Sequence, residues 1–257
     1  MIDWLVFSRD RALQLDGLLT SFDQYAAHLQ QSVTVLYRAT KPLHELAYLD
    51  CAKAHSRQMF WRQEGDFAED VFEWIEDRAG YYVGFLVDDD LFIRPAPPVE
   101  TVRPQAGEAC FALRLWTSIT RVSGNTVIRS WPHRAWPWRT SSELDYGYPL
   151  ALDGHVYRRD TISPLLDFDF ADPTQLEAGL AARADRLTYP LMAAAERQCL
   201  VGIPANRVSE NSGVPHMGGD VDELCERFLA GDRLDPDAMG LDHVASAHAE
   251  ISLAFRR

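Results

Sequence analysis

Apolar runs alternate with helical patterns over the first third of the chain. Bulky apolar residues fill positions 2–7, and positions 32–37 and 58–62 carry shorter strand-like patterns. Positions 12–29, 42–55 and 66–79 repeat apolar residues at the spacing of one helical face. A fourth apolar run covers positions 81–87. This order of strands and helices predicts an α/β fold, with a mostly parallel central sheet flanked by helices on both faces.

The pattern changes after a proline-rich stretch at positions 95–98, which separates the two halves 1–98 and 99–257. In the second half we expect strands at 110–115, 125–131, 150–158 and 201–204, and helices at 174–184, 191–199 and 221–229. Asp172 and Pro173 have the residue types of a helix N-cap and first helical position. The length of 257 residues accommodates one large core, so we expect a single domain.

Charge and cysteine content narrow the class of protein. The net charge is −13, and an acidic surface repels nucleic acid and anionic lipid, so neither is an expected partner. The cysteines form no CxxC pair, which predicts reduced, buried thiols without a zinc site or disulfide framework (Cys51, Cys110, Cys199 and Cys225). No run approaches the roughly 20 apolar residues that span a bilayer. The first residues lack a signal-peptide pattern, and we therefore expect a cytoplasmic protein.

Three adjacent carboxylates carry the clearest chemical signal. Asp88, Asp89 and Asp90 follow the fourth apolar run directly, and a further apolar segment comes after them. Adjacent carboxylates repel each other, so a cluster between buried segments needs a counter-charge. Bound Mg²⁺ or Mn²⁺ would supply it, because oxygen ligands suit these ions, whereas a solvated turn is the alternative. Ligands bind beyond the carboxyl ends of parallel strands, which predicts a cleft shared with Ser8 and Arg9.

The aspartate cluster resembles the D-x-D motif of GT-A glycosyltransferases, which follows the fourth strand of a nucleotide-binding half. The opening segment 7–19 (FSRDRALQLDGLL) resembles the polar loop and helix that grip the nucleotide in these enzymes. Segments 203–208 and 228–234 are similar to parts of bacterial glycosyltransferase-like proteins. The resemblance implies that Asp88 and Asp90 hold the metal. The expected nucleotide-binding residues are Phe7, Ser8, Arg9, Arg11, Arg38, Asp88 and Asp89.

Two segments of the second half extend the resemblance. Segment 152–158 (LDGHVYR) looks like the strand that lines the donor sugar, which implies sugar contacts from Gly154 and His155. Segment 172–177 (DPTQLE) looks like the helix start that carries the acceptor-activating carboxylate in inverting members. By this resemblance Glu177 is the base that removes the acceptor proton, with Asp153 and Asp172 as substitutes. Glu177 equally fits a first-turn acid favoured by the helix dipole.

Histidines and tryptophans complete the expected site. A C-terminal histidine completes the metal shell in many GT-A enzymes, which points to His248, with His243 and His216 as further candidates. A mixed carboxylate and imidazole shell favours Mn²⁺ over Mg²⁺. The stretch 131–139 (WPHRAWPWR) follows neither regular period, and such a mixture of aromatic and cationic residues suits a sugar surface. The expected acceptor or donor-sugar contacts are Trp116, Trp136 and Trp138.

The resemblance implies a metal-dependent, hexosyltransferase-type enzyme. Such an enzyme moves a sugar from a nucleoside diphosphate sugar, with UDP favoured because it is common in the group, to a hydroxyl of a saccharide or glycoconjugate. Two alternatives stay open: a metal-dependent phosphatase or nucleotidyltransferase on a related fold, and a non-catalytic protein that binds nucleotide-sugars or carbohydrates. The segment between Met1 and Asp16 holds no glycine, which argues against the glycine-rich loop of a nucleotidyltransferase.

Overall fold

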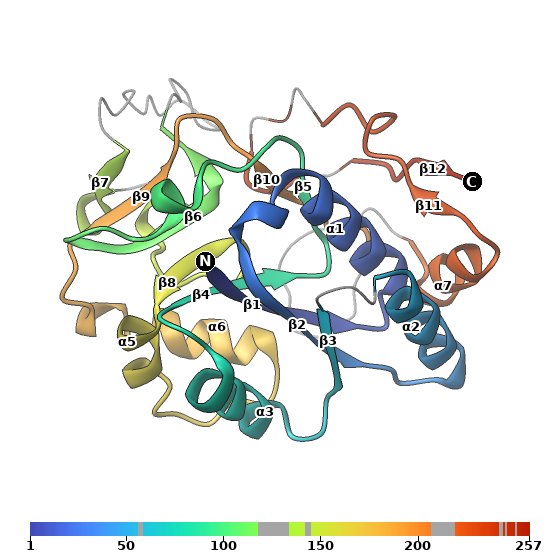
Figure 1. Ribbon diagram of the computed structural model, residues 1–257, viewed down its shortest axis with the longest axis horizontal. Helices are drawn as coiled ribbons and strands as arrows, with labels where there is room; N and C mark the ends of the chain where they lie inside the picture. The colour runs from blue at the N-terminus through green and yellow to red at the C-terminus, as the bar shows by residue number, and fades with distance from the viewer. Residues whose placement is uncertain are drawn as a thin grey trace.

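The fold is built around one eight-stranded sheet, in the order β3-β2-β1-β4-β8-β6-β9-β7 (Figure 1). The computed structural model describes residues 1–55, 59–117, 134–141, 145–206, 219–241, 244, 246–249 and 251–257. The strands of this sheet are β1 (Ile2–Arg9), β2 (Gln30–Arg38), β3 (Met59–Gln63), β4 (Tyr82–Val87), β6 (Glu108–Trp116), β7 (Ala135–Pro137), β8 (His155–Arg158) and β9 (Leu191–Ala195).

The first four strands of the chain that enter the sheet are parallel, as the repeated strand–helix pattern predicts. β1 pairs in parallel with β2 and β4, and β2 pairs in parallel with β3. The direction reverses at β8, which is antiparallel to both β4 and β6, while β6 and β9 are parallel. β7 closes the sheet antiparallel to β9. The carboxyl ends of β1, β2 and β4 therefore share one edge of a mostly parallel sheet.

Helices cover both faces of the sheet (Figure 1). β1 is buried on both sides, because Trp4 and Val6 point into one core and Leu5 and Phe7 into the other. Helices α1, α2 and α7 pack on the Trp4 side, and α3 and α6 pack on the Phe7 side. The helices are α1 (Ala12–Tyr25), α2 (Pro42–Ala54), α3 (Phe67–Glu73), α4 (Val99–Val102), α5 (Arg159–Ile162), α6 (Pro173–Ala181) and α7 (Val221–Leu229).

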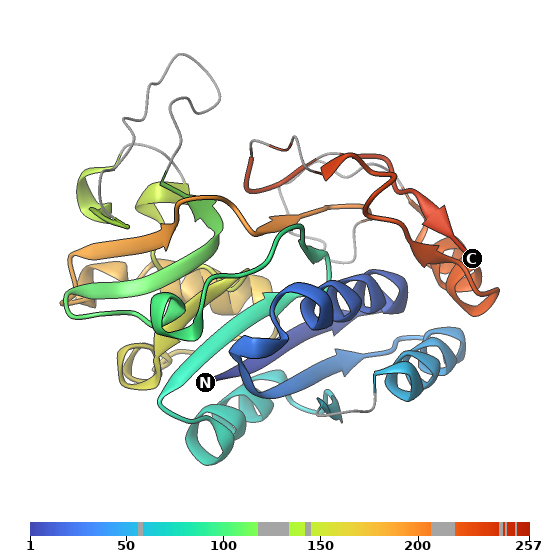
Figure 2. The same cartoon turned by 45° about the horizontal axis from the view of Figure 1, so that its top comes forward.

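Two small sheets fix the last part of the chain beside the first. β5 (Asp90–Phe92) pairs antiparallel with β10 (Leu200–Gly202), and Gly202 lies opposite Asp90. β11 (Arg233–Leu234) pairs with β12 (Phe255–Arg256). In Figure 2, α1 lies between the central sheet and this C-terminal pair. Of the helices in the described ranges, none is long and apolar enough to cross a membrane.

Three sequence expectations in the second half have different outcomes. The helix expected at 191–199 is wrong, because residues Leu191–Ala195 form strand β9 between β6 and β7. Its alanines favour a helix, but pairing on both sides outweighs that weak propensity. The strand expected at 150–158 begins only at His155, since Gly154 adopts a left-handed φ of 74°. The strand expected at 125–131 lies outside the described residues.

Both helix predictions around 174 and 221 are confirmed. Asp172 caps α6 by accepting a hydrogen bond from the Gln175 amide, and Pro173 occupies the first helical position. Helix α7 covers the expected residues, and Asp220 caps it by accepting from the amides of Asp222 and Glu223. Capping aspartates satisfy amides that have no partner within the helix.

Close packing in the sheet centre gives a stability prediction. A Cβ at Gly84 of β4 would lie 2.3–2.8 Å from ring atoms of the fully buried Trp4. We expect Gly84→Ala to lower the free energy of unfolding by about 1–3 kcal/mol through overpacking. Gly65→Ala is the matched control, because its nearest neighbour would be Asp70 Oδ2 at 3.9 Å. Urea unfolding followed by fluorescence measures both, and equal midpoints for the two variants would contradict the prediction.

Candidate functional site

The sheet edge brings together the two polar segments that the sequence places at strand ends. The amide of Asp88, directly after β4, donates to the Phe7 carbonyl of β1 at 3.1 Å. Asp88 Oδ2 accepts from Ser8 Oγ at 2.9 Å and from the Arg9 amide at 3.2 Å. The expected proximity of Ser8 and Arg9 to the aspartate cluster is confirmed.

A buried arginine supplies the counter-charge for the first two aspartates. Arg11 Nη1 lies 2.9 Å from Asp88 Oδ1 and 3.1 Å from Asp89 Oδ2. Burial raises the pKa of Asp88 to about 6, while the Arg11 guanidinium acts in the opposite direction. Both oxygens of Asp88 are therefore occupied by protein donors. Arg11, at the start of α1, thus neutralises Asp88 in this structure, whereas the sequence predicts a metal ion as its counter-charge.

A buried tyrosine locks this arrangement. Ser8 Oγ has one proton and gives it to Asp88, so the Tyr48 hydroxyl donates to Ser8 Oγ across 2.7 Å. Tyr48 also accepts from the Arg11 amide at 3.1 Å. This chain of hydrogen bonds links α2, the end of β1 and the aspartate cluster. The sequence analysis missed Tyr48, since a single tyrosine in a helical pattern looks like any core residue.

The third aspartate is in a different environment. Asp90 is fully buried, and its Oδ2 accepts from the Val87 amide at 3.1 Å. Its Oδ1 is buried without a hydrogen-bond partner in the described structure, as is Oδ1 of Asp153. Burial raises the pKa of Asp90 well above its ordinary value, and repulsion by Asp153 adds to the effect. Buried acceptors without partners are costly and mark a place for a ligand or an ion.

Arg114 of β6 faces this second pair of carboxylates. It is 3% exposed, forms an ion pair with Asp153 Oδ2 and donates to His248 Nε2 at 2.8 Å. Burial raises the pKa of Asp153 to about 8 despite the attraction of Arg114. Loss of hydration around the ring and the same guanidinium lower the pKa of His248, whose side chain is 40% exposed, and its Nε2 accepts from Arg114. An arginine within the apolar run FALRLW was the signal that sequence analysis overlooked.

The metal ligands expected from sequence do not come together as a set. Asp88 pairs with Arg11, and Nε2 of His248 accepts from Arg114. Within the described residues, Asp88, Asp90 and His248 form no group of closely spaced ligand atoms. His243 and His216 lie outside the described residues. Of the predicted set, Asp90 is the member with an open oxygen.

The carboxylate of Glu177 serves the loop ahead of Asp153. Its Oε2 accepts from the Leu152 amide at 2.9 Å and its Oε1 from the Tyr148 hydroxyl at 3.2 Å. Gly154 packs tightly, since a Cβ there would lie 2.3 Å from Leu200 Cδ2. His155 is buried, and burial lowers its pKa to about 3, so its expected contact with a sugar is not supported.

The tryptophans expected at a sugar surface are mostly core residues. Trp136 is fully buried and donates from its indole to the Tyr146 carbonyl at 2.8 Å. Trp138 is also buried and donates to the Tyr189 carbonyl at 3.0 Å. The sugar contacts expected of these two are therefore not supported, because both side chains are buried and their indole nitrogens donate to carbonyls inside the protein. Trp116, at the end of β6, stays partly exposed.

The remaining expected nucleotide contacts lie along the same edge. Arg9 is exposed at the end of β1, and Arg38 at the end of β2 is 51% exposed and pairs with Glu64 at 3.1 Å. The Phe7 side chain is buried against Phe85, so only its backbone faces the aspartate cluster. Asp10 has a left-handed φ of 57° and accepts from the amide and hydroxyl of Thr40, which ties β1 to the loop after β2.

The pairing of Arg114 with buried carboxylates predicts a pH-dependent loss of stability. Arg114→Met leaves buried polar groups without a partner, which we expect to cost about 1–3 kcal/mol at pH 7. Asp153 has a raised pKa in the folded state, and removing Arg114 raises it further, so the loss grows as pH rises from 7 to 9. Urea unfolding at both pH values measures this. In Arg114→Lys, which keeps the positive charge, the loss of unfolding free energy should grow little between pH 7 and 9. A loss of unfolding free energy in Arg114→Met that does not depend on pH would contradict this explanation.

No protein-family model matches the chain, and no curated protein does so. Several solved structures are similar to this chain. Residues 1–349 of S. aureus TarS in complex with UDP-GlcNAc are 13% identical, with a TM-score of 0.50 over 83% of this chain and 62% of that chain. Glucosyl-3-phosphoglycerate synthase from Mycobacterium tuberculosis, in complex with Mn²⁺, UDP and glucosyl-3-phosphoglycerate, is 14% identical, with a TM-score of 0.44 over 89% of this chain and 77% of that chain.

This chain thus spans less than two thirds of the length of the TarS structure. At such low identity the likeness concerns the fold and not the activity. The expected central sheet with helices on both faces is present. The comparison of the fold rests on the similarity to the TarS structure. The chain therefore has the α/β fold of the GT-A-type glycosyltransferases, as the sequence predicts.

Proposed function

We propose that this chain is a metal-dependent glycosyltransferase that moves a sugar from a nucleoside diphosphate sugar to a hydroxyl acceptor. The observation that carries the proposal is the group of carboxylates at the shared edge of β1 and β4, in a GT-A-type fold. Among the described residues, Oδ1 of Asp90 and Oδ1 of Asp153 are buried there without a hydrogen-bond partner. A UDP-sugar is the favoured donor, because the TarS structure of similar fold was solved with UDP-GlcNAc. A saccharide or glycoconjugate is the proposed acceptor.

The nucleotide lies, in this proposal, along the carboxyl ends of β1 and β2. Arg9 and Arg38 are exposed there and offer positive charge to the donor. The sequence predicts that Asp88 and Arg11 bind the nucleotide. In this proposal they instead pair with each other, and Asp88 holds the Ser8–Arg9 loop in place. Such a preformed loop binds its ligand without first paying the entropy of ordering.

Asp90 is the proposed protein ligand of a Mn²⁺ or Mg²⁺ ion. Its open Oδ1 fits, because hard divalent ions take carboxylate oxygens and are held together with substrate phosphates. The bound ion would stabilise the negative charge of the departing diphosphate. His248 is neutral and beside Arg114, so a role as an additional ligand would require its ring to leave that hydrogen bond.

Asp153 is the proposed base for an inverting transfer. Its Oδ1 is open, and a pKa of about 8 makes it a stronger proton acceptor than an ordinary carboxylate. Both oxygens of Glu177 hold Tyr148 and Leu152, so we assign Glu177 to positioning the Asp153 loop. The ion pair with Arg114 holds Oδ2 of Asp153 and leaves its Oδ1 available for the acceptor proton.

Donor binding is tested by thermal shift with UDP-, GDP-, TDP- and CMP-sugars, with and without Mn²⁺. A ligand of the native state raises the midpoint by mass action, and we expect a UDP-sugar with Mn²⁺ to give the largest rise. Asp90→Asn should lose the Mn²⁺-dependent part of the rise, whereas Asp185→Asn, an exposed control, should keep it. If no nucleotide-sugar stabilises the protein with either metal condition, the proposed function fails.

The assignment of the base is tested by steady-state kinetics of transfer. We expect Asp153→Asn to lower kcat by about 10²–10⁴-fold, the usual contribution of general-base catalysis, with donor binding kept. In Glu177→Gln the side-chain oxygen can accept from the Leu152 amide and the nitrogen can donate to the Tyr148 hydroxyl oxygen, so this variant should lose less than about tenfold in kcat. A loss as large as that of Asp153→Asn would return the role of base to Glu177. Because the base must be ionised, kcat/KM should rise with pH up to about 8.

The same assays separate the two alternatives. Release of phosphate or exchange of pyrophosphate without sugar transfer would indicate a phosphatase or nucleotidyltransferase. Donor binding with no turnover against any acceptor would indicate a non-catalytic binding protein.

A further inference from the structure

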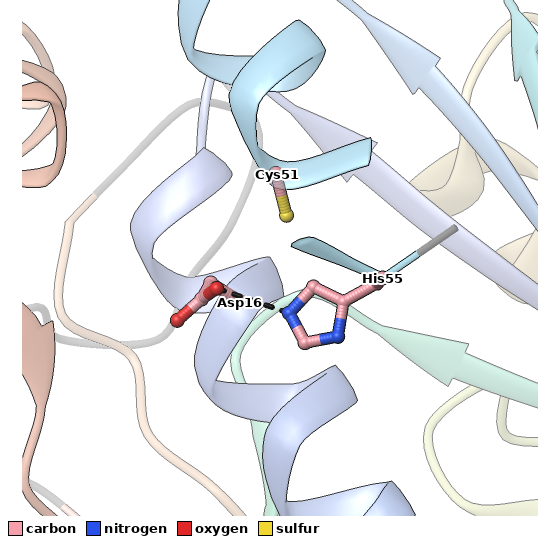
Figure 3. Close-up of side chains that lie close together, drawn as sticks. All are labelled: Asp16, Cys51 and His55. Atoms are coloured by element: carbon pink, nitrogen blue, oxygen red, sulfur yellow. Dashed lines mark hydrogen bonds and ion pairs between the residues drawn. The ribbon is translucent and has the colours of Figure 1, made fainter. Parts of the chain in front are cut away.

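A second cluster of ligand-type side chains lies away from the carboxylate edge, between α1 and α2. Asp16, Cys51 and His55 each offer one ligand atom, and these atoms all lie within 4.8 Å of one another (Figure 3). Among the residues that the structure describes, this is the one group of its kind. The proposed sugar transfer uses none of the three.

The local helix geometry explains why the cluster forms. Cys51 and His55 are four residues apart at the end of α2, and this spacing places both side chains on one face of the helix. The His55 amide donates to the Cys51 carbonyl at 3.0 Å, which fixes the last turn. Asp16 reaches the same space from α1, and its Oδ1 lies 3.0 Å from His55 Nε2. Figure 3 shows the Cys51 sulfur directed toward the gap between Asp16 and His55.

The three donors have the chemistry of a zinc site. A thiol, an imidazole and a carboxylate together suit a borderline ion such as Zn²⁺, whereas Mg²⁺ and Mn²⁺ prefer oxygen ligands alone. Tetrahedral zinc with bonds of about 2.0–2.3 Å needs ligand atoms about 3.3–3.8 Å apart. The separations are at most 4.8 Å, so the cluster would have to contract by no more than about 1 Å to meet that geometry.

The surroundings leave room for a fourth ligand and orient the carboxylate. A cavity of about 220 Å³ is lined by Asp16, His55 and Gly17, among others, and has room for a water molecule. Arg233 Nε lies 3.5 Å from Asp16 Oδ2 and leaves Oδ1 directed at His55. This guanidinium also stacks on Phe228 and donates to its carbonyl, so it is held in place by other contacts. Its positive charge opposes a cation, while its hydrogen-bonding direction orients the ligand oxygen.

We propose that Asp16, Cys51 and His55 bind Zn²⁺, with a water molecule from the cavity as the fourth ligand. The ion would join α1 to α2 close to the helix residues that hold the aspartate cluster: Arg11 precedes α1, and Tyr48 lies one turn before Cys51. The site would thus stabilise the packing that positions the nucleotide edge. The sequence did not indicate this site, because it has no CxxC pair. The single thiol, from Cys51, is joined by a histidine and an aspartate.

Titration with Co²⁺ tests the proposed zinc site, because it gives a spectroscopic signal that the aspartate cluster at the ends of β1 and β4 does not produce. Co²⁺ bound to a thiolate gives a charge-transfer band in the near ultraviolet, and Asp90 with its neighbours offers no thiol. We expect one equivalent of Co²⁺ to produce this band together with the visible bands of tetrahedral cobalt, and Zn²⁺ to remove both by displacement. Zn²⁺ should also raise the thermal midpoint of the wild-type protein.

Matched variants give the decisive comparison. Cys51→Ser should lose the charge-transfer band, and Asp16→Asn should bind Co²⁺ at least about tenfold more weakly. Cys225→Ser, which removes another buried thiol on α7, and Asp90→Asn should both keep the band. Circular dichroism establishes that each variant is folded. A wild-type protein without the band, or a band that survives in Cys51→Ser, would overturn the proposal whether or not sugar transfer is found.

Discussion

The pairing of buried carboxylates with two buried arginines is the interaction on which the site depends. Arg11 compensates Asp88 and Asp89, and Arg114 faces Asp153 beside Asp90. Isolated charges are costly inside a protein, so removing one partner of a buried pair destabilises the fold. Arg11 lies at the start of α1 and Arg114 on β6. Arg11 also donates to the carbonyl of Asn206, and this contact joins the two halves of the chain.

The three carboxylates differ in how many of their oxygens have a hydrogen-bonding partner, and this difference determines the proposed chemistry of the site. Asp88 has both oxygens occupied and acts as a structural anchor for the Ser8–Arg9 loop. Asp90 and Asp153 each keep one buried oxygen open, and burial raises the pKa of both. One open oxygen suits a divalent ion and the other suits a proton, so neighbouring carboxylates divide the proposed work. Groups fixed before the substrate arrives need no reorganisation during the reaction.

The order of strands and helices from β1 to β4 was predictable, whereas the partners of individual side chains were not. A run such as residues 2–7 is apolar throughout because both faces of β1 are covered, and helical periodicity identifies α1 to α3. The roles of Arg114 and Tyr48 depend on contacts across 39 or 40 residues of chain, such as Arg114 with Asp153 and Tyr48 with Ser8, which no local pattern encodes. Trp136 looked like a sugar platform because the pattern around it is irregular, yet short β7 buries it beside β9.

Anomalous diffraction from crystals grown with Mn²⁺ and a UDP-sugar tests the central claim most directly. The account predicts a manganese peak next to Asp90 Oδ1, with the diphosphate on the same ion and the nucleotide along the ends of β1 and β2. It also predicts that Asp88 remains paired with Arg11 and that Asp153 faces the sugar. A nucleotide bound elsewhere on the protein, or a manganese peak that displaces Arg11 from Asp88, would contradict it.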